Sequence, residues 1–216
     1  MSNPDSFLDE VAEAVRQDRF YHFARRYGWI LVLLIVLVVG GVGYWDWQRE
    51  RTASAAEAFG DALMAASASQ DAGVRALQLS ELAATGDQAA VRDLLAAGDL
   101  VQTDSQKAAD LLRALIDTEA ASAIYRDIAR LKLVQMADNR LTTDQRLEIL
   151  APLTPAGQPF RLTALELRAM VYIEQRETGK AMDDLRVLFN DAESSAGQKQ
   201  RARQMIIALG GDPEAV

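Results

Sequence analysis

One run of nineteen residues, at positions 27–45, contains no charged side chain. A helix rises about 1.5 Å per residue, so this run would extend roughly 28 Å, close to the ~30 Å core of a bilayer. Aromatic residues, which favour the membrane–water interface, stand at both ends of it. The run therefore predicts a transmembrane helix. We assign the membrane anchor to residues spread along it: Tyr27, Trp29, Leu33, Val36, Gly40, Gly43 and Trp45.

A cleaved signal peptide is the alternative interpretation of this run. The small residues at 53–55 (Ala-Ser-Ala) match the pattern of a cleavage site. However, the run is longer than the usual apolar stretch of about 7–15 residues, and Trp47, Arg49 and Arg51 separate it from that site. These features favour an uncleaved anchor.

The distribution of arginine predicts the orientation of the anchor. Four arginines precede the run and two follow within the next twenty residues: Arg16, Arg19, Arg25, Arg26, Arg49 and Arg51. Because positively charged flanks stay in the cytoplasm, the bias predicts a cytoplasmic N-terminus. We expect a single-pass protein of a bacterial inner membrane, with its C-terminal part in the periplasm.

These boundaries divide the chain into four parts. Residues 1–26 form a cytoplasmic stub, 27–45 the transmembrane helix, 46–70 a helical extension and 71–216 a far-side domain. Apolar residues of the stub recur at helical spacing and predict an amphipathic helix: Phe7, Leu8, Val11 and Val15. This helix either lies on the inner face of the membrane or docks on a cytoplasmic partner, for example a response regulator.

The composition excludes several kinds of chemistry. The chain of 216 residues has a net charge of −8, no cysteine and one histidine, His22. Disulfides, thiolate metal sites, cysteine nucleophiles and multi-histidine metal sites are therefore excluded. The acidic balance disfavours a nucleic-acid partner, because phosphates require a basic surface. We expect no enzyme activity, no cofactor, no metal and no small-molecule substrate.

Carboxylate pairs remain as candidates for acid–base chemistry, as an envelope enzyme acting on peptidoglycan would need. Adjacent residues on a helix, such as Asp183 and Asp184, do not converge on one point, so we expect them on a solvated face. Alternating charges near the C-terminus likewise predict ion pairs on an exposed face. The residues concerned are Arg161, Arg168, Arg176, Arg186, Glu166, Glu174 and Glu177.

The far-side domain predicts an all-α fold of helical hairpins. Turn signals rich in Gly, Asp, Asn and Pro separate apolar-periodic segments throughout it. Short helices joined by short turns pack as antiparallel neighbours. The expected helices cover residues 72–84, 87–98, 104–117, 120–137, 143–151, 160–177, 179–190 and 195–208.

Internal similarity indicates that these hairpins are repeats. The segment beginning at Lys107 (KAADLL) is similar to the segment beginning at Lys180 (KAMDDL). Small and large residues in both blocks, and Ala129 in a middle unit between them, fall at the spacing of the packing positions of a tetratricopeptide repeat. These predicted packing residues are Ala96, Ala108, Leu112, Ala129, Ala169, Tyr172, Ala181 and Leu185. Asp99 and Lys132 stand where the repeat usually has an aromatic residue. The pattern predicts an α-solenoid, with a generic helical bundle as the alternative.

The whole layout resembles the family of ancillary subunits of the bacterial SecYEG translocon. The similarity is carried by Val15-Arg16 and residues 20–23 before the uncharged run, by Gly43-Tyr44-Trp45 at its end, by residues 55–63, and by the Lys-Ala pairs of the repeats. The resemblance implies a non-catalytic protein at the translocon exit that links SecYEG to periplasmic chaperones and assists envelope protein export. The alternative is an accessory subunit of another inner-membrane assembly, such as a respiratory or cytochrome-maturation complex.

Overall fold

The computed structural model describes residues 33, 34, 37, 41, 44, 45, 47–51, 53–136 and 140–213. Every regular element within these residues is a helix, which confirms the all-α prediction. The chain divides into two compact units, Met1–Ala58 and Phe59–Val216. One of the turn signals in the sequence, Asp138-Asn139, lies outside the described residues.

The described residues of the first unit are helical and expose large apolar side chains. Trp45, for example, is 80% exposed. The Arg51 guanidinium lies 4.2 Å from the centre of the Trp47 ring, a cation–π contact. Five predicted anchor residues lie outside the described part of the chain: Tyr27, Trp29, Val36, Gly40 and Gly43.

Within the part of the chain that the structure describes, no helix combines the length and apolar character needed to cross a membrane.

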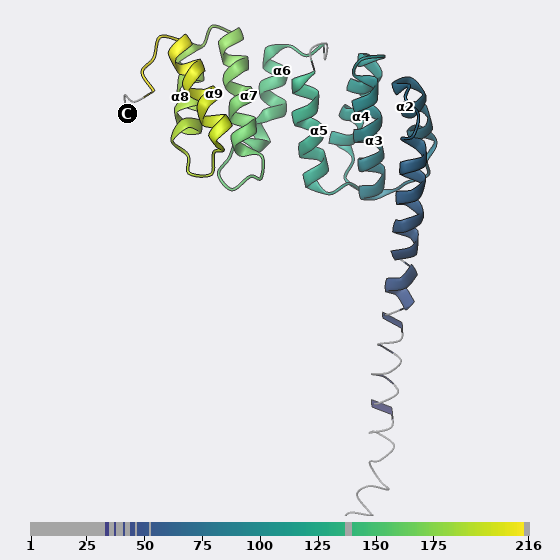
Figure 1. Cartoon of the computed structure of the whole chain (residues 1–216). Coiled ribbons are helices and arrows are strands. Elements are labelled where there is room, and N and C mark those ends of the chain that lie inside the picture. Colours follow the sequence, from purple (N-terminus) through teal and green to yellow (C-terminus); the bar gives the residue numbers. More distant parts are fainter. Residues whose placement is uncertain are drawn as a thin grey trace, which may run out of the picture. The chain divides into compact units, whose positions relative to one another are not determined.

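The second unit is a row of short helices that follow one another along the chain (Figure 1). A helical segment up to residue 66 precedes them. The α-helices lie within three residues of the bounds that the sequence predicts. They are α2 (Ala72–Glu81), α3 (Gly86–Leu100), α4 (Ser105–Asp117), α5 (Ala123–Gln135), α6 (Thr143–Leu150), α7 (Arg161–Glu174), α8 (Thr178–Asn190) and α9 (Ala196–Ala208), with a 3-10 turn η1 (Ala151–Leu153) after α6.

Side chains at the helix ends set these bounds. Asp104 caps α4 by accepting a hydrogen bond from the Lys107 backbone N–H at 3.1 Å. Helix α5 begins three residues later than predicted because Ser122 is held outside it. The Ser122 backbone N–H and its Oγ each donate to the Asp87 carboxylate at 2.7 Å. Helix α7 ends early because Arg176 adopts a left-handed conformation with φ of 62°.

The hydrophobic core is continuous from one helix to the next. Each helix packs against its neighbour in the chain, and α5 additionally contacts both α3 and α7. Four buried clusters follow one another, shared by α2–α3, by α3–α5, by α5–α7 and by α7–α9. Each helix pair therefore buries its apolar face only by stacking on neighbours, as expected for a solenoid.

The residues that the sequence predicts for repeat packing lie mostly in this core. Seven of the eight are buried, each with at most 1% of its surface exposed: Ala96, Ala108, Leu112, Ala129, Ala169, Ala181 and Leu185. The eighth, Tyr172, is partly exposed. The ammonium group of Lys180 lies 5.6 Å from its ring centre and the Arg168 guanidinium 5.9 Å from it.

The expectation of a solvated charged face near the C-terminus is wrong for several residues. Asp184 is only 6% exposed and accepts two hydrogen bonds of 2.7 Å from Arg168. Glu166 is 7% exposed and pairs with Arg201 of α9, with one bond of 2.9 Å. Because α7, α8 and α9 pack together, these carboxylates face neighbouring helices, and the arginine forks satisfy them there.

We predict that enlarging a buried alanine at a helix crossing destabilises the stack. Ala169→Leu adds three carbon atoms against Leu185 and Ile206, and we expect a loss of roughly 1–3 kcal/mol in the free energy of unfolding. Urea unfolding of the full chain in mild detergent, followed by circular dichroism, measures it. Ala123→Leu, at the exposed start of α5, is the matched control. Equal effects of the two substitutions would contradict the packing argument.

Candidate functional site

Two adjoining cavities lie along the C-terminal ends of α3, α5 and α7. The larger has a volume of about 620 Å³ and lies between α5, α6 and α7. The smaller, of about 180 Å³, lies between α3, α4 and α5. Gln135 and Met136 line both, so the cavities meet at the end of α5. We call the combined surface the α5 groove; its characteristic residues are Gly98, Lys132, Met136, Arg140, Met170 and Glu174.

The larger cavity belongs to the helix pair with the shortest second helix. Pro152 stands in the 3-10 turn that follows α6, and proline cannot continue an α-helix. Helix α6 has 8 residues and α7 has 14, so their lengths are roughly 12 and 21 Å. The α5–α6 pair therefore fills less space than its neighbours and leaves room beside α7.

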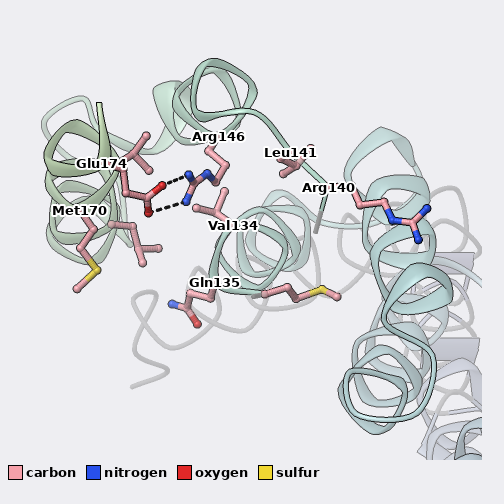
Figure 2. A pocket seen from close by; sticks show the side chains of 10 residues that line it. Val134, Gln135, Arg140, Leu141, Arg146, Met170 and Glu174 are labelled. Carbon is pink, nitrogen blue, oxygen red and sulfur yellow. Dashed lines mark hydrogen bonds and ion pairs between the residues drawn. The ribbon is translucent and has the colours of Figure 1, made fainter. Parts of the chain in front are cut away.

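An ion pair crosses the larger cavity (Figure 2). The Arg146 guanidinium donates two hydrogen bonds to the Glu174 carboxylate, one of them to Oε1 at 3.0 Å. These bonds hold the pKa of the Glu174 carboxyl below its usual range, against the opposing effect of burial. Gln175 adds bonds of 2.9 Å to Thr143 Oγ1 and 2.8 Å to Asp144 Oδ1. These bonds thus connect the start of α6 to the C-terminal end of α7 at this side of the groove.

Buried apolar residues form the base of the groove. Val134 of α5, Met136 at its C-terminal end and Val171 of α7 are each less than 9% exposed. Met170 of α7 is 39% exposed and lines the same cavity. Methionine side chains are flexible and polarisable, and they adapt to ligands of different shape. The groove therefore offers an apolar surface suited to side chains of another protein.

Two exposed cations border this apolar base. Lys132 and Arg140 form no ion pair with any described residue, whereas the Arg130 guanidinium is paired with Asp127 at 2.7 Å. The Arg140 side chain lies apart from the Arg146–Glu174 pair and points away from it (Figure 2). Lys132 and Arg140 therefore give the described part of the groove a positive character, although residues 46–216 contain nineteen Lys and Arg against twenty-six Asp and Glu, a net charge of −7.

A third, more apolar cavity lies between α2 and α4. Its volume is about 570 Å³, and it is lined by Ala76, Leu77, Leu100, Leu111 and Ala114. Leu77 is 61% exposed. This cavity has no comparable exposed and unpaired charge: among its lining residues, Lys107 pairs with Asp104 and Asp110 pairs with Arg113.

One groove residue, Lys132, is marked in the sequence by a departure from the repeat pattern. This residue stands where the repeat pattern expects an aromatic, and the structure places it at the edge of the smaller cavity. The other departure, Asp99, accepts a hydrogen bond of 3.0 Å from Arg75 Nε and ties α2 to α3. Of the predicted packing residues, Leu112 lines the smaller cavity. Met136, Arg140 and Met170 were not identified, because no periodic pattern marks them.

Comparison with protein families places this chain among tetratricopeptide repeat-like domains. The match covers residues 20–208, and the chain belongs to that family. No curated protein and no solved structure matches the chain. The family and the stacked helices favour the repeat-like solenoid over a generic bundle. Such domains are protein-interaction scaffolds and are typically non-catalytic.

Among the described residues, no group of three or more His, Asp or Glu side chains is arranged to hold a metal ion.

We predict a pH-dependent contribution of Glu174 to stability. Its pKa is lower in the folded than in the unfolded chain, so the Arg146 contact stabilises the fold above the unfolded pKa and is lost as pH falls through the folded pKa. Carbon-detected NMR titration should show this depressed pKa, and Arg146→Met should return the pKa toward the ordinary value of a glutamate.

In urea unfolding, the stability difference between wild type and Arg146→Met should shrink below about pH 4. Arg186→Met, an exposed arginine of α8, is the control and should give a difference that does not change with pH in this range. An unshifted Glu174 titration in the wild type would contradict the assignment.

Proposed function

We propose that this protein is a membrane-anchored interaction scaffold. One observation carries the proposal: the family match begins at residue 20, before the uncharged run, and continues to residue 208. The run and the helical repeats therefore belong to one family unit, which supports a retained anchor over a cleaved leader. In this proposal residues 27–45 fix the location of the protein, and the solenoid binds other proteins.

The proposed location is a bacterial inner membrane, with the N-terminus in the cytoplasm and the solenoid in the periplasm. The excess of arginine before the uncharged run supports this orientation. The exposed Tyr44, Trp45 and Trp47 support an interfacial position at the end of the run, because such aromatic residues favour the headgroup region. The Arg51 guanidinium over Trp47 is compatible with the same layer.

The proposed role is that of an ancillary subunit of the Sec translocon that links it to periplasmic chaperones and assists envelope protein export. Support comes from the similarity around the uncharged run and in the repeat segments, and from the protein-binding character of the family. A solenoid offers an extended surface for partner segments, which fits a linking role.

Purification in mild detergent tests this role. We expect a C-terminally tagged full chain to recover SecYEG components from inner membranes, and a tagged control of residues 1–70 to recover less of the periplasmic chaperones. Recovery of the full chain without any Sec component would contradict the translocon assignment. Co-elution of haem-containing subunits instead would favour the other inner-membrane assembly.

A further inference from the structure

We propose that the α5 groove binds an acidic, apolar segment of a partner protein. Carboxylates of the segment would contact Lys132 and Arg140, and its apolar side chains would occupy the larger cavity beside Met136 and Met170. This inference rests on the proposed function as a protein scaffold and specifies the chemistry of one partner.

The charge of the groove favours an acidic occupant. Arg130 of α5 and Arg146 of α6 are each neutralised by a carboxylate, whereas Lys132 and Arg140, which line the groove, are exposed and form no ion pair with a described residue. Lys132 stands in the last turn of α5, where the helix dipole favours a positive charge. The helix dipole acts only within this last turn and supplies no counter-charge. The Lys132 ammonium group is therefore exposed to solvent and available to a carboxylate. Two such cations in an acidic domain create a local electrostatic preference for carboxylates.

The shape of the groove favours apolar side chains next to those carboxylates. The larger cavity, of about 620 Å³, is large enough for several side chains, and buried residues of α5 and α7 line its base. The smaller cavity continues past Gly98, where an added Cβ would meet no atom within 4 Å. A protein segment fits these features better than a nucleic acid or an anionic bilayer, because the net charge of −7 over residues 46–216 repels extended polyanions.

Gly98 provides a variant that blocks the groove without disturbing the fold. Gly98→Leu places a side chain in open space at the smaller cavity, and leucine is the better helix former. Lys132→Met/Arg140→Met removes the two charges and keeps side-chain length. Arg186→Met/Lys199→Met removes two charges from α8 and α9 and serves as the matched control. Circular dichroism in urea confirms that each variant folds.

The binding experiment uses the full chain in an uncharged detergent and an array of short synthetic peptides in which acidic, basic and leucine content vary independently. We expect the peptides rich in both Asp/Glu and Leu to bind, at least about tenfold more tightly than their Lys counterparts, and more weakly as salt increases. Both groove variants should weaken binding about tenfold or more, and the control pair by less than about twofold.

Three results would overturn the inference. They are the absence of binding to acidic apolar peptides, equal binding by the groove variants and the wild type, or preferential binding to vesicles containing phosphatidylglycerol. Purification of Sec components with the same variants distinguishes a failure of this inference from a failure of the proposed function. If Gly98→Leu and Lys132→Met/Arg140→Met still recover SecYEG while no peptide binds the wild type, the scaffold role stands and the groove assignment falls.

Discussion

Fully buried alanine residues allow the helices of this row to pack closely against one another. Ala108 and Ala129 lie in the cluster shared by α3 to α5, and Ala169 lies in the cluster shared by α7 to α9. With so little side chain at these positions, consecutive helices pack closely and share the four buried clusters. The groove follows from this arrangement, because the C-terminal ends of α3, α5 and α7 come to lie side by side.

Hydrogen bonds and ion pairs between polar side chains add to the packing of the small apolar residues. Asp87 joins the start of α3 to Ser122 before α5, and Arg75 joins α2 to Asp99 of α3. In the last three helices, Arg168 and Arg201 satisfy carboxylates that face a neighbouring helix. These bonds connect residues far apart in the sequence, so they fix how each helix is placed against the next. Lys132 and Arg140 differ from them, since each is exposed and has no ionic partner among the described residues.

Much of the helical layout could be predicted from the sequence, because turn residues and apolar spacing are local signals. Thr142 with Gln145, and Ser195 with Gln198, form capping boxes at the helix starts that the sequence marks. The exposure of charged residues could not be predicted in the same way. Whether Asp184 faces solvent or α7 depends on the rotation of α8 in the stack, which adjacent acidic residues do not specify. The groove is hidden for the same reason, since its lining comes from the ends of several helices.

We propose that the uncharged run holds the helical repeats on the far side of a membrane from the N-terminal stub. Since the chain has no cysteine, a single introduced cysteine is a specific topology probe. Two variants of the full chain, Ser2→Cys and Glu193→Cys, are treated with a membrane-impermeant maleimide in intact spheroplasts and after lysis. Glu193 is exposed between α8 and α9. We expect labelling of Glu193→Cys in intact spheroplasts and of Ser2→Cys only after lysis; the reverse pattern, or equal labelling of both in intact spheroplasts, would contradict this topology.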